Sequence, residues 1–182
     1  MTAIIFYSTT DGQTKKIAEK MADDWNGDVK VLTINELPNY VNDKSIGQVI
    51  VGASIRYGHY NKVVMELIHT HVDWLEAKNA AFFSVNLTAR KPEKQDPANS
   101  AYIQRFIKST GWMPNQIAMF AGRLCYPKYS FIDRQMIRLI MKMTGGCADG
   151  TSTIEYTNWD EVKRFSKTVS GLNVRSKAVK AA

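Results

Sequence analysis

Five short apolar runs recur along the chain, and the segments between them have the spacing of amphipathic helices. Each run spans five or six residues and is apolar almost throughout, which is typical of a strand covered on both faces. Strands that alternate with helices in this way predict a parallel sheet between two layers of helices. The expected strands are residues 3–7, 29–34, 48–53, 80–85 and 116–121, and the expected helices are residues 15–25, 61–75, 99–109 and 159–170.

Length and composition fit one globular domain. The 182 residues are 45% hydrophobic and 23% charged, close to the averages of globular proteins, so we expect a single domain over residues 1–182. Uninterrupted apolar runs stay well below the roughly 18 residues that a membrane-spanning helix needs. The N-terminal segment lacks the pattern of a signal peptide, so we expect a cytoplasmic protein.

Positive charge is concentrated in the second half of the chain. Residues 1–87 carry 8 basic and 10 acidic side chains, whereas residues 88–182 carry 16 basic and 7 acidic ones, including a basic tail over about residues 173–182. This asymmetry favours an anionic partner such as a nucleic acid, a membrane surface or an acidic small molecule.

A long segment interrupts the alternation of strands and helices. About 36 residues, from 122 to 157, separate the fifth strand from the last helix, where a loop of roughly 2–6 residues is usual. Residues 131–143 within this insertion predict a further helix that ends at a pair of glycines. On this helix Arg134, Arg138 and Lys142 form a basic stripe beside a wide apolar face. We expect an insertion of this length to have a function.

Three loops at one edge of the expected sheet have the residues of a nucleotide site. Ligands of open parallel sheets bind beyond the carboxyl ends of the strands. Residues 8–14 combine hydroxyl groups, a glycine and a helix N-terminus, which suit a phosphate group without Lys or Arg, although they match neither a Walker loop nor a G-x-G-x-x-G fingerprint. Residues 54–60 add aromatic side chains, and residues 86–95 add an amide and backbone donors. Together these loops favour a mononucleotide with a planar ring.

Several motifs in these loops and in the insertion resemble a known family. Y-S-T-T-D-G-Q-T at residues 7–14 looks like the FMN phosphate loop of flavodoxins, with Thr9, Gly12 and Thr14 at matching positions and Asp11 in place of the usual hydroxyl or small residue. A closer likeness is to one branch, the menaquinone-dependent protoporphyrinogen IX dehydrogenases. It runs from residue 4 to about residue 170 and is carried by V-G-A-S-I-R-Y-G-H-Y at 51–60, S-V-N-L-T-A-R-K-P-E-K at 84–94, Y-P-K-Y at 126–129 and M-I-R-L-I-M-K-M-T-G-G at 136–146.

This resemblance implies a fold, a cofactor and an activity. The implied fold is a flavodoxin-like α/β three-layer sandwich, with a five-stranded parallel sheet in the order 2-1-3-4-5, helices on both faces and a long insertion after strand five. The implied activity is FMN-dependent oxidation of protoporphyrinogen IX to protoporphyrin IX in haem biosynthesis, with electrons passed to menaquinone or ubiquinone. The membrane quinone, together with the basic residues of the insertion, leads us to expect peripheral association with an anionic surface at the cytoplasmic face of the inner membrane. Whether the protein is a homo-oligomer is left open.

The resemblance also implies which residues form the site, although it assigns the catalytic role to no single side chain. Basic groups could hold the two substrate propionates, because guanidinium and ammonium groups match carboxylates, and a histidine near the ring could relay a proton. These candidates are Arg56, His59, Arg90, Lys91 and Arg123. The expected cofactor-binding residues are Ser8, Thr9, Thr10, Asp11, Gly12, Gln13, Thr14, Ser54, Ile55, Arg56, Tyr57, Gly58, Ser84, Val85, Asn86 and Leu87.

Metal binding and a cysteine framework are not expected. His69 and His71 are two residues apart, so on one helix they would point about 200° apart. His59 has no Cys or carboxylate at the spacing of a metal site. Cys125 and Cys147 do not form a C-x-x-C pair. No metal is therefore included among the expected cofactors.

Other functions share some of these features. An electron-carrier flavodoxin or another FMN-dependent quinone reductase would have the same fold, although carriers are usually acidic and this chain has a net charge of +7. A phosphoacceptor receiver is excluded, because Ala53 and Ser54 stand where its Asp is needed. A nucleic-acid-binding module is only weakly allowed by the basic and aromatic residues Lys128, Tyr129, Phe131 and Arg134, and we expect no nucleic-acid partner.

The predicted helix of the insertion suggests a membrane role. We expect residues 126–146 to lie at the membrane surface, with the basic stripe on anionic headgroups and apolar side chains guiding quinone and porphyrinogen toward the ring. The alternative is that the apolar face packs on the sheet and the basic stripe is merely solvated.

Overall fold

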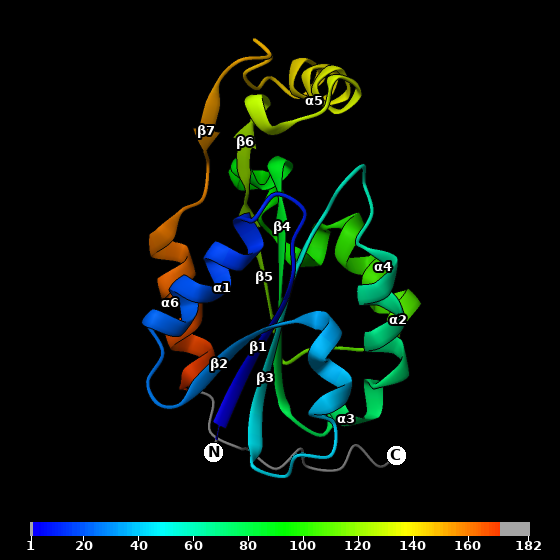
Figure 1. Ribbon diagram of the computed structural model, residues 1–182, viewed down its shortest axis with the longest axis vertical. Coiled ribbons are helices and arrows are strands. Elements are labelled where there is room, and N and C mark those ends of the chain that lie inside the picture. The colour runs from blue at the N-terminus through cyan, green and yellow to red at the C-terminus, as the bar shows by residue number, and fades with distance from the viewer. Residues whose placement is uncertain (1, 172–182) are drawn as a thin grey trace.

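The computed structural model describes residues 2–171. A five-stranded parallel sheet forms the centre of the molecule (Figure 1). The strands lie in the order β2-β1-β3-β4-β5, as predicted. Ile5 of β1 pairs with Val31 of β2 on one side and with Ile50 of β3 on the other. The strands are β1 (Thr2–Ser8), β2 (Val29–Thr33), β3 (Ile46–Ser54), β4 (Asn79–Asn86) and β5 (Gln116–Ala121).

Helices cover both faces of the sheet, so the predicted three-layer sandwich is confirmed (Figure 1). One layer contains α1 (Gln13–Asp23) and α6 (Trp159–Ser170). The other contains α2 (Lys62–Thr70), α3 (Val72–Glu76) and α4 (Ala101–Thr110). Short 3-10 helices lie in the connections: η1 (Ile34–Asn39), η2 (Leu87–Arg90), η3 (Pro92–Lys94), η4 (Pro97–Asn99) and η5 (Tyr126–Lys128).

Each face of the sheet has its own hydrophobic core. On the side of α2 and α4, Phe82 and Phe106 stack with ring centroids 4.1 Å apart, and Trp112 packs edge-on against both rings. On the side of α1 and α6, Phe83 packs with Ile17 and other fully buried side chains. Because both faces are buried, the inner strands are apolar along most of their length, which makes their positions readable from the sequence. The edge strand β2 is less apolar and carries the exposed Lys30.

The helix expected over residues 61–75 is two helices, so that prediction was wrong in detail. The chain leaves the helical conformation at His71, where φ is −114° and ψ is 24°. Nδ1 of His69, in the last turn of α2, lies 3.3 Å from the carbonyl oxygen of Thr110. The apolar spacing continues through the break, with Val64, Ile68 and Leu75 all buried, so periodicity could not reveal it.

The insertion lies at one end of the molecule, beyond the carboxyl ends of the strands (Figure 1). It contains α5 (Phe131–Met143), at the bounds that the sequence predicts. It also contains β6 (Arg123–Cys125) and β7 (Thr153–Glu155), which pair as an antiparallel ribbon. Three residues are too short a run to show period-two alternation, so the sequence analysis missed this ribbon.

The sequence left two orientations for α5, with its basic stripe either on lipid headgroups or merely solvated. The structure shows neither for Arg134 and Arg138, which lie against the protein. The inward side of α5 carries Ile137 and Met141, which are buried in a small cluster with Leu124 and two tyrosines. Arg134 and Arg138 flank that side and are half-buried, and Nε of Arg138 donates to the carbonyl oxygen of Ala148 at 3.0 Å. Because the cluster under α5 is small, it buries only a narrow part of the apolar arc and leaves the rest in solvent.

Two further expectations concern the basic C-terminal tail and membrane-spanning helices. The basic tail expected over residues 173–182 lies outside the described residues. Within residues 2–171, no helix combines the length and apolarity needed to cross a bilayer.

Candidate functional site

A pocket opens where the carboxyl ends of the strands meet the insertion. The loops after β1, β3 and β4 converge on it, as the topology of a parallel sheet requires. Most of the predicted site residues line this pocket: Thr9, Thr10, Asp11, Gln13, Thr14, Ser54, Ile55, Arg56, Tyr57, Gly58, Val85, Asn86, Leu87 and Arg123.

The loop between β1 and α1 forms one end of the pocket. Gly12 precedes the helix with a φ of 90°, a left-handed conformation that favours glycine, and its N–H donates to Oγ1 of Thr9 at 3.0 Å. The hydroxyl of Thr14 is fully buried and has no hydrogen-bond partner among residues 2–171. A buried donor that lies at a helix N-terminus suits an anionic oxygen such as that of a phosphate.

Asn86 supplies a second unpaired group on the other side of the pocket. Its Oδ1 accepts hydrogen bonds from the hydroxyl of Thr88 at 2.6 Å and from the N–H of Ala89 at 2.9 Å. These bonds fix the amide, and Nδ2 is buried with no partner within the described part of the chain. The donor suits an acceptor atom on a ring. Thr14 and Asn86 therefore fit a molecule that carries a phosphate and a polar planar ring, which is the composition of FMN.

A tight turn after β3 forms the rim of the pocket. Arg56 and His59 exchange backbone hydrogen bonds of 2.9 and 3.1 Å around Tyr57 and Gly58, whose φ values are 51° and 79°. Both central residues are thus left-handed, as in a two-residue type I′ turn. The ring of Tyr57 remains 47% exposed at the pocket edge, where a flat ligand could stack on it.

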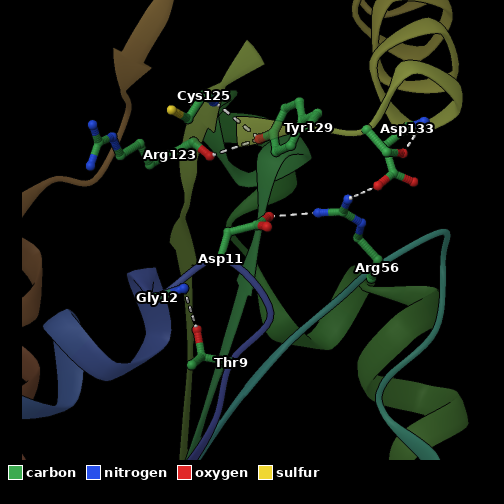
Figure 2. A network of polar contacts seen from close by, with 9 residues as sticks. Thr9, Asp11, Gly12, Arg56, Arg123, Cys125, Tyr129 and Asp133 are labelled. Atoms are coloured by element: carbon green, nitrogen blue, oxygen red, sulfur yellow. Dashed lines mark hydrogen bonds and ion pairs between the residues drawn. The ribbon is translucent and has the colours of Figure 1, made fainter. Parts of the chain in front are cut away.

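Arg56 joins three segments that are distant in the sequence (Figure 2). Its guanidinium lies 2.6 Å from Oδ2 of Asp11, in the loop after β1, and 3.1 Å from Oδ2 of Asp133, in the first turn of α5. It also lies over the rings of Tyr129 and Tyr57, at 5.2 and 5.3 Å from their centroids. Arg56 therefore ties the insertion to the loop that suits a phosphate.

Tyr129 forms the wall of the pocket beside this network (Figure 2). Its hydroxyl accepts a hydrogen bond from the N–H of Cys125 at 3.1 Å and lies 3.5 Å from the carbonyl oxygen of Arg123. Burial raises the pKa of the Tyr129 phenol above its usual value.

The basic candidates divide into two groups. Arg56 and Arg123 line the pocket, whereas His59, Arg90 and Lys91 do not. Arg90 donates to the carbonyl oxygens of Leu87 at 2.8 Å and Thr144 at 2.9 Å, so it holds the loop after β4 against the end of α5. Nδ1 of His59 lies 2.8 Å from the carbonyl oxygen of Tyr57, within its own turn.

Three expected cofactor residues also lie outside the pocket lining, namely Ser8, Gly12 and Ser84. The hydroxyl of Ser84 is buried and accepts a hydrogen bond from Tyr60 at 2.9 Å, which gives it a place in the core. Conversely, the sequence analysis did not assign several residues that line the pocket. These are Thr88, Tyr102, Gly122, Tyr129, Ile137 and Ile140. Ile137 and Ile140 come from α5, and only the tertiary packing of the insertion places them there.

A second contact fixes the far side of the insertion. Glu155 of β7 accepts hydrogen bonds from Nζ of Lys16 at 3.0 Å and from Nε2 of Gln13 at 3.0 Å. Burial acts to raise the pKa of Glu155, but the bonds from Lys16 and Gln13 outweigh it and hold the pKa below its usual value. Gln13 also donates to the hydroxyl of Thr157 at 2.9 Å. The first turn of α1 therefore supports both the pocket and the insertion.

Comparisons with known proteins agree with this geometry. Residues 4–151 match the model of the flavodoxin domain family. A protoporphyrinogen IX dehydrogenase (quinone) of Escherichia coli K12 is 40% identical over 177 residues, which cover 94% of this chain and 96% of the relative. A protein of the same name from Leishmania major is 41% identical over 173 residues, which cover 93% of this chain and 74% of the relative. This chain belongs to the protoporphyrinogen IX dehydrogenase (quinone) family of flavodoxin-domain proteins.

Family membership confirms the resemblance that the loop motifs indicated. Among solved structures, rubredoxin oxygen:oxidoreductase of Desulfovibrio gigas superposes with a TM-score of 0.50 at 13% identity, covering 93% of this chain and 35% of that one. At such low identity the superposition shows a shared fold and nothing about function.

Proposed function

We propose that this protein binds FMN in the pocket and oxidises protoporphyrinogen IX to protoporphyrin IX, with a quinone as electron acceptor. The observation that carries the proposal is the pair of buried donors, Thr14 Oγ1 and Asn86 Nδ2, which lack partners within residues 2–171 and line one pocket. They stand at the two positions where the family resemblance places the phosphate and the ring. The names of the E. coli and Leishmania relatives supply the substrate and the acceptor class.

The pocket residues would bind the two ends of FMN separately. The loop of residues 9–14 would hold the phosphate through Thr14 and the N-terminus of α1, because backbone N–H groups and the helix dipole favour an anion there. Tyr57 and Asn86 would flank and orient the ring. When bound, FMN supplies the hydride and electron chemistry that the side chains of this chain cannot provide.

Two arginines with atoms in the pocket lining, Arg56 and Arg123, are the candidates for binding the substrate propionates, because guanidinium groups form charge-assisted hydrogen bonds with carboxylates. The guanidinium of Arg56 pairs with Asp11 and Asp133, so a propionate would have to replace one of these carboxylates. The side chain of Arg123 points away from Asp11 and Arg56 (Figure 2), so it would have to turn toward the pocket. Ile137 and Ile140 of α5 give the same pocket an apolar wall, which suits a porphyrinogen macrocycle and excludes water around it. His59, Arg90 and Lys91 are not included, because they lie outside the lining.

We further propose that residues 2–171 act as one domain that associates peripherally with a membrane. The acceptor quinone of the relatives' reaction is a lipid when it is menaquinone or ubiquinone. The insertion stands at the pocket end of the molecule (Figure 1), so association through that end would bring the pocket to the acceptor.

Anaerobic turnover tests this function. Purified protein with FMN should convert protoporphyrinogen IX to fluorescent protoporphyrin IX when a soluble quinone such as menadione is added, and much more slowly without it. Protein without FMN is the control. Rapid oxidation of NAD(P)H with the same quinone, without porphyrin formation above the uncatalysed rate, would instead establish a general quinone reductase.

A further inference from the structure

The outward side of α5 is an apolar stripe on the surface of the protein. Ile132, Met136, Leu139 and Met143 recur every three or four residues and therefore lie on one side of the helix. Their exposed fractions are 75%, 45%, 56% and 79%. Of the eight large hydrophobic residues that are exposed within residues 2–171, these four and Phe131 lie on α5. Such a concentration marks an interaction surface rather than scattered exposure.

The charges around the stripe indicate what covers it. Lys128 lies just before α5 and Lys142 lies in its last turn, and both are exposed. Residues 126–146 contain four basic side chains and a single acidic one, Asp133, which is half-buried and paired with Arg56. An apolar stripe bordered by cations at both ends of the helix is complementary to an anionic lipid surface.

A second copy of the chain is a poorer fit to the same surface. The stripe is one helix wide, whereas a standard protein interface involves roughly 20–30 residues on each side. Two copies facing each other through α5 would also bring their lysines together. A bilayer surface has neither problem, because lysine side chains can extend from the apolar zone to the headgroups.

We propose that α5 lies in the surface of an anionic bilayer with Ile132, Met136, Leu139 and Met143 among the acyl chains and Lys128 and Lys142 at the headgroups. This inference rests on the peripheral association proposed above and names its contact surface. The half-buried Arg134 and Arg138, which the sequence suggested as the headgroup contacts, face the protein instead. Because Ile137 and Ile140 of the same helix line the pocket, the bilayer would meet the pocket wall directly.

Flotation of the FMN-loaded protein with lipid vesicles tests the surface. Vesicles of phosphatidylcholine, with and without phosphatidylglycerol, would be compared for wild type and the variant Ile132→Ser/Leu139→Ser/Met143→Ser. These three side chains are exposed and outside the pocket, so the fold and the FMN site should persist. We expect vesicle affinity to fall at least tenfold in this variant. The matched control is Val63→Ser/Met113→Ser, which removes two exposed apolar side chains away from α5 and should bind like wild type.

A second variant tests the contribution of Lys128 and Lys142, the cations at the two ends of α5. Lys128→Glu/Lys142→Glu should lose affinity for vesicles that contain phosphatidylglycerol and change little with phosphatidylcholine alone, and high salt should reproduce this loss for wild type.

Turnover separates this inference from the proposed function. The triple serine variant should oxidise protoporphyrinogen with soluble menadione at the wild-type rate but lose rate with menaquinone embedded in vesicles. No vesicle binding by wild type, or equal binding by the triple variant, would overturn the membrane contact while soluble turnover still reports on the enzyme. Concentration-dependent dimers that the triple variant abolishes, without vesicle binding, would overturn it in favour of a second copy.

Discussion

Helices α4 and α5 have similar amphipathic patterns but opposite relations to the core. On α4, Ile103 and Phe106 are buried on the sheet. On α5, only Ile137 and Met141 are buried, while Phe131 at its start is 74% exposed. The sheet offers α4 a wide apolar face, whereas the cluster beneath α5 is small. The comparison shows that periodicity predicts a helix, but the surface available beneath it decides how much of its apolar arc is buried.

The largest expected effect is on the free energy of unfolding, when the same Phe→Ala substitution is made on α4 and on α5. Phe106→Ala should lower the free energy of unfolding by about 3–5 kcal/mol, because it leaves a cavity beside Phe82 and Trp112. Phe131→Ala should change it by less than about 0.5 kcal/mol, since its ring is in solvent. Urea unfolding of both variants measures the difference. Similar losses would mean that the ring of Phe131 packs against the protein in solution.

The next effect concerns the binding of FMN where the sheet meets α1. Thr14→Val should weaken FMN binding by about 1–3 kcal/mol, roughly 5- to 150-fold, because a buried donor to the phosphate is lost. The FMN-free protein should be no less stable, since this hydroxyl has no partner within the described residues. Fluorescence titration with FMN gives the affinity.

A control for the Thr14 variant lies on α6. Ser166 is buried, and its hydroxyl donates to the carbonyl oxygen of Met21 at 2.8 Å, away from the pocket. Ser166→Ala should reduce stability by about 1 kcal/mol and leave FMN affinity unchanged. Retention of wild-type affinity by Thr14→Val would refute the phosphate assignment.

A smaller effect on stability is expected at the ion pair between Arg56 and Asp133, which joins the insertion to the loops of the sheet. Asp133→Asn removes one carboxylate from Arg56 and should lower the free energy of unfolding by no more than about 1 kcal/mol, because both side chains are partly exposed. Hydrogen exchange in the first turn of α5 should nevertheless become faster, since the insertion loses a tether. Asp160→Asn in the first turn of α6 controls for the helix dipole. Unchanged exchange in α5 would show that Arg56 does not hold it.

The smallest expected effect is the pH dependence of the stability contributed by Glu155, which ties β7 of the insertion to Lys16 and Gln13 of α1. The lowered pKa of Glu155 means that its bonds to Lys16 and Gln13 contribute stability fully above its ordinary pKa of 4.5 and lose this contribution as pH falls below it. Glu155→Gln should therefore lower stability by about 0.5 kcal/mol at pH 7, and its difference from wild type should shrink toward pH 3. Urea midpoints over this range measure the trend; a difference that grows in acid would contradict it.

Much of the site was accessible from the sequence because it lies at fixed places in the fold. The ends of β1, β3 and β4 were predicted within a few residues, and the loops that follow them carry Thr14, Tyr57 and Asn86. Parallel strands bring these loops to one edge whatever the details of packing. Sequence position placed Arg90 near the pocket but could not show that its guanidinium donates to backbone carbonyls and that it lies outside the pocket lining.

The sequence by itself determined the strands, most helices and the family, because apolar periodicity and loop motifs are local properties of the chain. Only the tertiary structure decided that Arg56 bridges Asp11 and Asp133, that Ile140 reaches the pocket and that Arg134 and Arg138 of α5 turn inward. These features depend on which surfaces meet in the folded chain, and the bridge from Arg56 to Asp11 spans 45 residues. Side-chain pairing over such separations follows from packing geometry, which no local pattern encodes.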